Sequence, residues 1–467
     1  KPVTVRPDGE EISRTDSRVF TGSSDFPLEF PANTLPGSSR AELTIYPNLL
    51  SHVEESIEGL LRRPYGCAEQ TISSTFPNLM ILKVTGDDSE DRKKLRARAK
   101  RNLQRGYDRL VGYQSSDGGF SYWGGKSDTD VALTAYALRF LSDATGIIEV
   151  DDSIVENARR RLIAMQRGDG SWSTQYSWEP AEDTQRTRKI TAFVARVLAM
   201  SMPKRDPKAM EDSPSESALK KALAYLKTRN AEIDEPYALA NYGLAALDSN
   251  DTETARRIAD KLSSMAIAEG PDKVYWNLET NTPFYGWGTP GRIETTALVV
   301  QLLARVGELD QDQSSKVKDQ ISKATLFLLK NKDRYGVWYS TQATVNVLDA
   351  LLATLTKPAA QKVTVSVNGT VVRTIDIAAD QIEPATVDLT DRIAPGTKVE
   401  VTASNESKVL SQLVTSHYID WKDSQSTSRN VNQSRAAELG YSCDKTNGRI
   451  METVTCSVSA ERVGFKG

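Results

Sequence analysis

The chain has 467 residues with a formal net charge of −3, and 39% of them are hydrophobic. This length predicts about three domains with a sizeable buried core, and the near balance of charge argues against a general nucleic-acid binder. Three cysteines and two histidines exclude a disulfide-built scaffold and a cysteine-rich zinc module, so we expect no metal site and no cofactor. No apolar run is long enough to span a membrane, and the start is interpreted as a cut within a longer protein.

The first 46 residues are expected to be extended. Apolar and polar residues alternate over Phe26–Phe30 and Ala41–Tyr46, and Pro36-Gly37 between them is typical of a turn. The polar stretch before Phe26 is expected to be loop.

Helical periodicity dominates from about residue 48 to residue 354. Apolar residues between Leu49 and Leu61 recur every three or four positions, the spacing of one helix face, and Pro64 ends this helix. Further helices are predicted at residues 77–85, 92–111, 131–141, 154–166, 190–200, 217–229, 238–247, 253–266, 293–306, 314–329 and 342–353.

The connections between these helices repeat. A turn with glycine and an aromatic residue precedes an apolar helix rich in small residues, at 114–120, 166–172, 284–287 and 332–338. Such repeats favour about six helix pairs closed into an α/α barrel, with an open solenoid as the alternative. We expect four tryptophans of these turns to be packing wedges rather than parts of ligand cages: Trp123, Trp172, Trp287 and Trp338.

After residue 357 the period changes to two. Val363–Val367 and Val371–Ile377 flank Asn368-Gly369, a dipeptide that favours a two-residue hairpin turn, and strands are predicted at 398–403 and 409–418. A small β-domain interrupted by a helical insertion explains both β regions. Residues 422–437 are predicted to be a linker, and a strand from residue 453 begins a further β-domain that is expected to be truncated.

The clearest chemical feature is the pair Cys67 and Gln70. Residues three apart lie side by side on a helical turn, so the Cys67 thiolate can reach the Gln70 carboxamide carbon. Loss of ammonia then leaves an internal thioester, an activated acyl group that an amine or hydroxyl can take while Cys67 leaves. Such a bond needs protection from water, which predicts an apolar cover from Tyr65 and from aromatic residues of another domain.

The same residues also have an ordinary structural interpretation. A free cysteine is usually a small buried hydrophobic residue. Glu69 is then simply an acidic residue in the first helical turn, where the helix dipole favours it.

The segment Pro64–Gln70 resembles the Pro-Tyr-Gly-Cys-Gly-Glu-Gln motif of the thioester-containing proteins, the family of alpha-2-macroglobulins and complement components. The similarity extends over about residues 47–352. Further segments resemble the family in the same order: Thr75–Leu79, Gly106-Tyr107, Asp117–Phe120, Leu133–Tyr136, Ile190–Phe193, Glu294–Thr296 and Ser340–Thr344.

The resemblance implies a mainly α fold, with an α/α toroid inserted in a small CUB-like β-sandwich. Its implied layout is residues 1–46 and 358–422 for the two parts of the sandwich, 47–357 for the thioester domain, and 423–467 for a linker and the start of a receptor-binding-type β-domain. It also implies that Gln70 is the acyl electrophile and Cys67 the leaving thiolate, supported by Pro64, Tyr65, Gly66, Ala68 and Glu69.

Two positions depart from the family pattern. Ala68 replaces the commoner glycine, which has a cost if this position needs a positive φ. The loop 171–180 contains no histidine, whereas some complement members have one there that turns the thioester toward hydroxyls. We therefore expect direct attack by amines. Tyr176 and Glu179 of this loop are candidates to approach the site, without assigned roles.

These features predict a covalent trap that is not an enzyme. A protease cuts a bait region elsewhere in the full-length protein, shielding domains of the same chain release the thioester, and lysine amines of the protease attack it. The alternatives are a complement-like opsonin that tags surfaces, a terpene-cyclase- or prenyltransferase-like enzyme, and a purely structural toroid without the bond. An extracellular or bacterial periplasmic or surface location is expected, with no membrane insertion by this fragment.

The remaining candidates have structural interpretations. Cys443 and Cys456 flank a turn and either form a disulfide across a hairpin or stay unpaired in a core. Nine Lys and Arg residues from Arg92 to Arg109 form a basic helix, interpreted as a solvated face rather than a nucleic-acid site. His52 and His417 are expected to be structural or solvent-facing.

Overall fold

The computed structural model describes most of the chain. The described residues are 7–20, 22–46, 61, 63–84, 90–125, 128–173, 184–202, 211–309, 315–332, 338–354, 360–378, 381, 384–394, 396–404, 409–423, 437–444 and 455–462. Within them no helix has the length and apolarity that crossing a membrane requires. His52 and all but one residue of the helix predicted at 49–61 lie outside the described residues.

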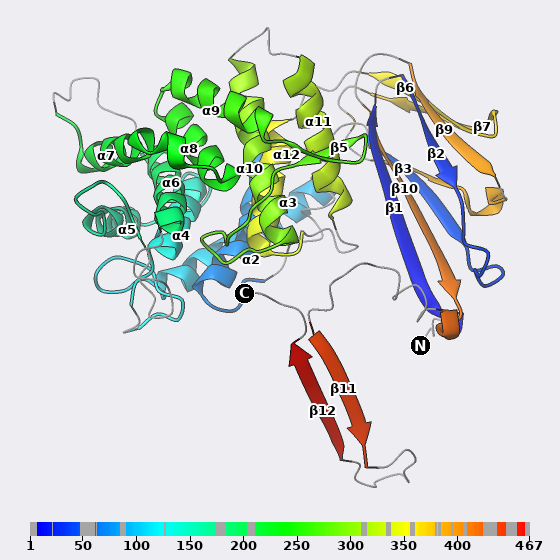
Figure 1. Cartoon of the computed structure of the whole chain (residues 1–467), viewed down its shortest axis with the longest axis horizontal. Coiled ribbons are helices and arrows are strands. Elements are labelled where there is room, and N and C mark those ends of the chain that lie inside the picture. Colours follow the sequence, from blue (N-terminus) through cyan, green and yellow to red (C-terminus); the bar gives the residue numbers. More distant parts are fainter. Residues whose placement is uncertain are drawn as a thin grey trace.

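The helices form an inner and an outer layer, and together they lie on the left of Figure 1, opposite the strands on the right. Each inner helix contacts the next inner helix, and the last contacts the first, which closes the ring. The predicted α/α toroid is thereby confirmed, and the open solenoid is wrong. The inner helices are α2 (Ala68–Val84), α4 (Val131–Ala144), α6 (Thr184–Ser201), α8 (Pro236–Asp248), α10 (Thr289–Glu308) and α12 (Thr341–Ala353).

Five outer helices each pack against the inner helix that precedes them in the chain. They are α3 (Glu90–Val111), α5 (Asp152–Ala164), α7 (Pro214–Thr228), α9 (Thr252–Ser264) and α11 (Ser315–Lys330). Short elements lie in the connections and loops: η1 (Asn230–Glu232), β4 (Ile267–Glu269), β5 (Lys273–Tyr275) and η2 (Thr390–Arg392).

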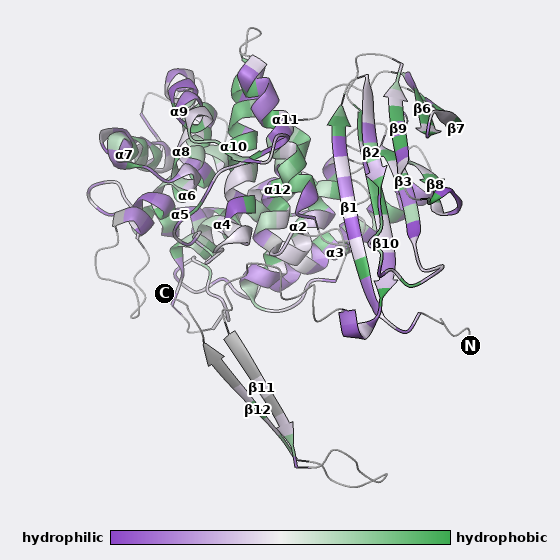
Figure 2. Ribbon diagram, turned by 45° about the vertical axis from the view of Figure 1, so that its right-hand side comes forward, coloured by the Kyte–Doolittle hydropathy of each residue, from purple (hydrophilic) through white to green (hydrophobic). Residues whose placement is uncertain are grey.

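The sequence of each helix explains its layer. The inner helix α8 buries every residue from Pro236 to Ala246, whereas α9 buries one face at a helical spacing, including Ala255, Ile258 and Leu262. A helix that is apolar all round needs neighbours on every side, and an amphipathic helix needs one. Figure 2 shows this contrast between hydrophobic α8 and the more hydrophilic outer helices.

Three buried tryptophans join outer helices to the following inner helices in the same way. The indole N–H donates to a leucine carbonyl at the end of the outer helix, and the backbone N–H donates to a threonine hydroxyl of the inner helix. The joints are Trp172 with Leu162 and Thr191, Trp276 with Leu262 and Thr296, and Trp338 with Leu328 and Thr344.

The prediction of four tryptophan wedges is correct for Trp172 and Trp338, which are both 0% exposed. It is wrong for Trp123 and Trp287, which are 75% and 57% exposed. Trp276 takes the role that the sequence pattern assigned to Trp287, because it is the residue that reaches both the outer helix and Thr296.

The first inner helix begins nine residues earlier than predicted. α2 starts at Ala68 and carries Pro77 in its interior, so the prediction that Pro77 starts the helix is wrong. An interior proline removes one backbone hydrogen bond. Side chains of Ser74, Thr75 and Asn78 donate to backbone carbonyls one turn earlier and supply polar contacts along this stretch.

Strands from both sides of the helical segment share two four-stranded sheets. One has the order β1 (Glu10–Phe20), β10 (Val409–Ile419), β3 (Arg40–Tyr46), β8 (Ala385–Asp388). The other has the order β2 (Ser23–Leu28), β9 (Thr397–Ala403), β6 (Gln361–Val367), β7 (Thr370–Ile377). Their facing sides form one apolar core around Phe26, Leu43, Val365, Val399 and Leu413.

The loop expected before Phe26 is in fact strand β1, which pairs with β10 from Glu10–Ile419 to Phe20–Val409. Its polar residues conceal it in the sequence, because an edge strand with one solvent-facing side tolerates them. The predicted turn at Asn368-Gly369 is confirmed: both residues have positive φ, 48° and 79°, as the favoured two-residue turn requires.

A hairpin of β11 (Ala437–Cys443) and β12 (Cys456–Arg462) lies apart from the rest in Figure 1. Cys443 and Cys456 face each other in its register and are joined by a disulfide. Residues 424–436, within the predicted linker, lie outside the described residues.

Candidate functional site

The turn before α2 brings Cys67 and Gln70 together. The Gln70 Oε1 accepts the backbone N–H of Cys67 at 3.2 Å, so the carboxamide folds back over the cysteine. Gly66 makes this possible: its φ is +81°, and a Cβ there would lie 1.9 Å from Gln70 Oε1. Only glycine satisfies both the conformation and the close approach.

Two elements hold this turn from outside. The Gly66 carbonyl accepts Arg109 Nη2 at 2.6 Å and the Tyr113 hydroxyl at 2.7 Å. The Ala68 N–H donates to the Tyr122 carbonyl at 3.0 Å. The motif is therefore fixed between the end of α3 and the loop that follows it, which restricts the position of the cysteine.

Ala68 causes no backbone strain. It is the first residue of α2, has no positive φ and is fully buried. The residue of the motif with positive φ is Gly66, so the alanine in place of the commoner glycine has no conformational cost.

The two partners differ in exposure. Cys67 is 8% exposed, whereas Gln70 is exposed. Tyr65, expected to help cover the bond, is 50% exposed. The described residues thus bury the sulfur but leave the acyl side open.

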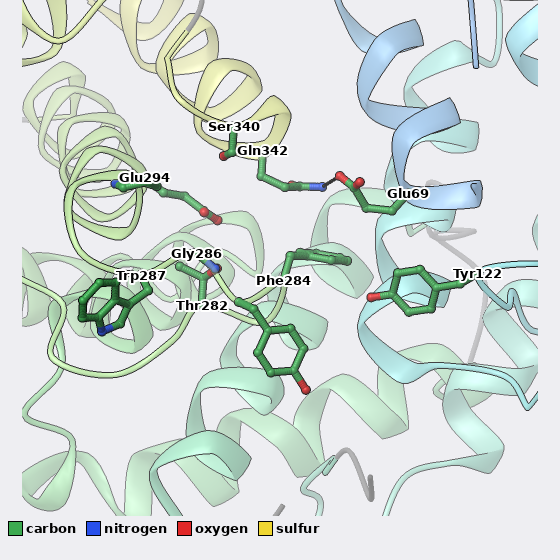
Figure 3. Close-up of a pocket in the computed structure, with 11 residues that line it drawn as sticks. Glu69, Tyr122, Thr282, Phe284, Gly286, Trp287, Glu294, Ser340 and Gln342 are labelled. Carbon is green, nitrogen blue, oxygen red and sulfur yellow. Dashed lines mark hydrogen bonds between the residues drawn. The ribbon is translucent and has the colours of Figure 1, made fainter. Parts of the chain in front are cut away.

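Glu69 makes its contacts inside the ring. Its Oε1 accepts the Ser73 hydroxyl at 2.7 Å and Gln342 Nε2 at 3.3 Å, which links α2 to α12. Figure 3 shows Gln342 between Glu69 and Glu294. Glu69 lies in the first turn of its helix, as the sequence predicts, and also lines a pocket.

This pocket has a volume of about 660 Å³. Two carboxylates and four aromatic residues dominate its lining: Glu69, Glu294, Tyr122, Phe284, Tyr285 and Trp287.

Glu294 is 2% exposed, and its Oε1 lies 3.3 Å from both the Tyr237 hydroxyl and Asn346 Nδ2. Burial raises the pKa of Glu294 to about 7. Burial, together with the charges of Asp130 and Glu69, also raises the pKa of Tyr122 well above its usual range. The Tyr122 carbonyl accepts the Ala68 N–H, so this wall of the pocket adjoins the motif turn.

The other predicted candidates lie away from this turn or outside the described residues. Tyr176 and Glu179 are outside them. His417 packs edge-on against Phe30 with ring centroids 5.7 Å apart, and burial lowers its pKa, which fits a structural role. On α3, Arg109 holds the Gly66 carbonyl, so it is more than part of a solvated face.

Sequence reasoning assigned no role to Tyr122, Tyr113 or Arg109, or to the pocket residues Glu294 and Gln342. Glu294 and Gln342 lie in segments that resemble the family, which was the available signal. Their joint position across the ring depends on closure of the toroid and cannot be derived from local spacing.

Residues 41–353 match the family described as the A-macroglobulin TED domain. The chain belongs to this family. Thioester-containing protein 1 of Anopheles gambiae, allele S1, is 26% identical over 307 residues, which cover 64% of this chain and 22% of that protein. Allele S3 is 25% identical over the same share.

Solved structures share the fold. The Salmonella alpha-2-macroglobulin reacted with methylamine superposes with a TM-score of 0.56 at 18% identity, over 96% of this chain and 26% of that one. Native Escherichia coli alpha-2-macroglobulin, from domain MG7 to the C-terminus, has a TM-score of 0.56 at 17% identity, over 95% of this chain and 62% of that one. The chain spans about a fifth of the length of the curated relatives that it matches.

Proposed function

We propose that this chain is the thioester-bearing part of an alpha-2-macroglobulin-like protease trap. The observation that carries the proposal is the folded-back Gln70 carboxamide, whose oxygen is held on the Cys67 N–H at a turn that only Gly66 permits. This contact supports the proposal that the Gln70 acyl group and the Cys67 thiol can react with each other.

The chemistry has two steps. The Cys67 sulfur attacks the Gln70 carboxamide carbon, the C–N bond breaks, and the thiol proton leaves with ammonia. Later an amine attacks the same carbon, the C–S bond breaks, and Cys67 takes up the proton released by the amine. The bond is consumed once, so the protein is a single-turnover trap and not an enzyme.

Amines of the attacking protease are the proposed nucleophiles: its lysine side chains react after the protease has cut the bait. The loop 171–180 lacks the histidine that would favour hydroxyls. The Salmonella alpha-2-macroglobulin that shares this fold reacted with methylamine, and this is consistent with an amine as the nucleophile in the present chain. The open acyl side of Gln70 requires a cover from shielding domains elsewhere in the full-length chain until activation.

A complement-like opsonin is the second candidate, because a thioester can also be attacked by the hydroxyl groups of a surface. The two differ in their adducts. Incubation of activated protein with a protease and with a polysaccharide should give mainly amide adducts; ester adducts released by hydroxylamine would instead support the opsonin.

The proposal includes a layout and a location. Residues 1–46 and 358–422 form a CUB-like sandwich, residues 47–357 form the thioester domain, and residues 423–467 begin a further β-domain. An extracellular or bacterial periplasmic or surface location fits this assignment.

Intact mass tests the bond directly. The native protein should weigh one ammonia less than the sum of its residues, and methylamine should add to Gln70 while exposing one thiol at Cys67. Cys67→Ser and Gln70→Ala should abolish the mass deficit, whereas Gln104→Ala, a change on neighbouring α3, should preserve it. A free Cys67 thiol with no mass deficit in full-length protein would leave only a structural toroid.

A further inference from the structure

The peptide group between Gly66 and Cys67 has hydrogen bonds at both ends. Its carbonyl oxygen accepts Arg109 Nη2 at 2.6 Å and the Tyr113 hydroxyl at 2.7 Å, and its N–H donates to Gln70 Oε1 at 3.2 Å. Two donors therefore meet on one carbonyl, and the opposite end of the same peptide group contacts the acyl group that reacts in the proposed chemistry.

Helix capping explains why the two reacting side chains meet. Cys67 directly precedes α2, and Gln70 is the third residue of that helix. In a capping box, a side chain at the third helical position bonds back to the N–H of the cap residue. Gln70 makes this bond, and Cys67 occupies the position where serine or threonine is usual. The capping geometry therefore holds the carboxamide beside the cysteine before any covalent bond forms.

Negative charge develops on Oε1 of Gln70 in both steps of the proposed chemistry. When the Cys67 sulfur or an incoming amine attacks the acyl carbon, the C=O double bond gives one electron pair to Oε1. The pair returns when the C–N bond breaks as the thioester forms, or when the C–S bond breaks as the amine reacts. Oε1 stays on Gln70 throughout, so one preorganised donor lowers both barriers.

We infer that Arg109 and Tyr113 polarise the peptide group that precedes Cys67 and thereby make its N–H the oxyanion donor of the thioester. Donors on a peptide carbonyl draw electron density toward its oxygen and leave the N–H more positive, so hydrogen bonds at the two ends strengthen each other. This inference rests on the function proposed above. Only the N–H contacts a reacting atom, so Arg109 and Tyr113 are positioning residues and exchange no proton.

Arg109 adds a positive charge that no described carboxylate neutralises. Among the described residues its side chain contacts the Gly66 carbonyl, the Thr71 hydroxyl at 3.2 Å and the Tyr113 ring, with Cζ 5.7 Å from the ring centroid. A charged donor makes a hydrogen bond roughly twice as strong as a neutral one. The guanidinium therefore polarises the carbonyl more than a neutral donor would, and its bond to Thr71 of α2 fixes its orientation.

A clamp that only holds the turn in place is the alternative interpretation, and the two differ in the sign of one effect. Weakening a structural clamp loosens the turn, so water should reach the thioester more easily and hydrolyse it faster. Weakening an oxyanion donor should instead slow attack by water and by amines alike. The half-buried Tyr113 allows this test, because phenylalanine removes the hydroxyl and keeps the ring.

Tyr113→Phe is tested in full-length protein whose mass deficit shows that the bond has formed. Release of the Cys67 thiol by methylamine and spontaneous hydrolysis should both slow about threefold to tenfold. Tyr107→Phe, on α3, is the matched control: its hydroxyl accepts the Asp151 N–H at 2.9 Å, at the start of α5, so both rates should stay native. Unchanged or faster hydrolysis in Tyr113→Phe would overturn the inference.

Arg109 is tested by rescue. Arg109→Ala should slow the methylamine reaction by a similar factor, and Arg109→Lys, which keeps the charge but loses the planar guanidinium, should recover part of the rate. Methylamine and n-butylamine should be slowed equally, because the effect is on the acyl carbon, whereas a distorted entrance would slow the larger amine more. Equal rates in Arg109→Ala and the exposed control Arg105→Ala would contradict the inference.

Infrared spectroscopy measures the carbonyl itself. The thioester band is obtained as the difference between untreated and methylamine-treated protein. This band should lie at a higher frequency in Tyr113→Phe than in the native protein, because a weaker hydrogen bond leaves the C=O bond with more double-bond character. A band at the native frequency would count against the polarised N–H.

The same measurements separate this inference from the proposed function. A native full-length protein with no mass deficit would reject the trap itself. A native deficit with equal rates in Tyr113→Phe and Tyr107→Phe would reject the oxyanion donor and leave the trap standing. If both variants melt like the native protein but only Tyr107→Phe forms the bond, the inference is supported, because bond formation places charge on the same oxygen.

Discussion

Three buried tryptophans of the toroid differ sharply from two exposed tryptophans in similar turns. Trp172, Trp276 and Trp338 are fully buried, and each ties two helices by two hydrogen bonds. Trp123 and Trp287 follow similar glycine-containing turns but are largely exposed. The first group stabilises the ring, whereas the second leaves hydrophobic side chains largely exposed.

The largest difference should appear in stability. Trp276→Ala removes a buried ring and the indole hydrogen bond to the Leu262 carbonyl, so it should lower the free energy of unfolding by about 3–5 kcal/mol, although the backbone N–H can still donate to Thr296. Trp123→Ala should change it by less than about 0.5 kcal/mol, because the side chain is exposed. Urea unfolding of the two variants checks this, and similar losses would break the comparison.

The buried pocket residue Glu294 sharpens the contrast. Ionising its carboxyl should lower the stability of the fold, a cost that the tryptophan joints do not have. The folded-state pKa of Glu294 is about 7, against an ordinary value of 4.5. The protonated Glu294 carboxyl therefore contributes to the stability of the fold below about pH 4.5, and this contribution is lost as the pH rises through 7.

Glu294→Gln should remove this dependence. The variant should gain stability relative to the native chain between pH 4 and pH 8, by at most about 3 kcal/mol. Thermal unfolding across this range measures the effect, with Glu308→Gln as control. A constant difference between variant and native chain would contradict the assigned pKa.

A substitution in the motif turn should act differently from one in a tryptophan joint. It should lower the free energy of unfolding only slightly but should abolish formation of the thioester. Gly66→Ala should cost about 1–2 kcal/mol from its positive φ and should abolish the methylamine-released thiol, because the new Cβ displaces Gln70. Gly146→Ala is the matched control, with φ +84° and open space around it. It should lose similar stability and keep the thiol release, measured by thiol titration.

The smallest effect concerns the support of this turn. Arg109→Ala removes the hydrogen bond to the Gly66 carbonyl and should lower stability by about 1 kcal/mol. Arg105→Ala, on the exposed side of the same helix, should be neutral. Chemical unfolding compares them; an equal effect would mean that Arg109 acts only through its helix.

Much of the fold can be predicted from the sequence, because helical periodicity and repeated turns are local signals. The closed ring, the hairpin at Asn368-Gly369 and the pairing of distant β regions all follow from such patterns. The choice between Trp276 and Trp287 does not, since both lie near glycine turns and only the position of Thr296 decides which ring is buried. Strand β1 was missed because its solvent-facing residues are polar.

The site divides in the same way. Cys67 and Gln70 are predictable because their chemistry depends on neighbours in sequence. The pocket depends on Glu69, Tyr285 and Glu294 from three parts of the ring, and no local pattern indicates that they converge. Tyr285 even opposes its local preference, because an aromatic residue seldom adopts positive φ.

The interleaved sheets have a consequence for how the chain is made on the ribosome. Strand β3 pairs with β10, which is translated only after the whole ring, tens of seconds later at ordinary rates of synthesis. Until then the early strands have unpaired edges, which are templates for incorrect association. The ring has mostly neighbouring contacts and can be completed first, so the sandwich is expected to be the last part of this unit to fold.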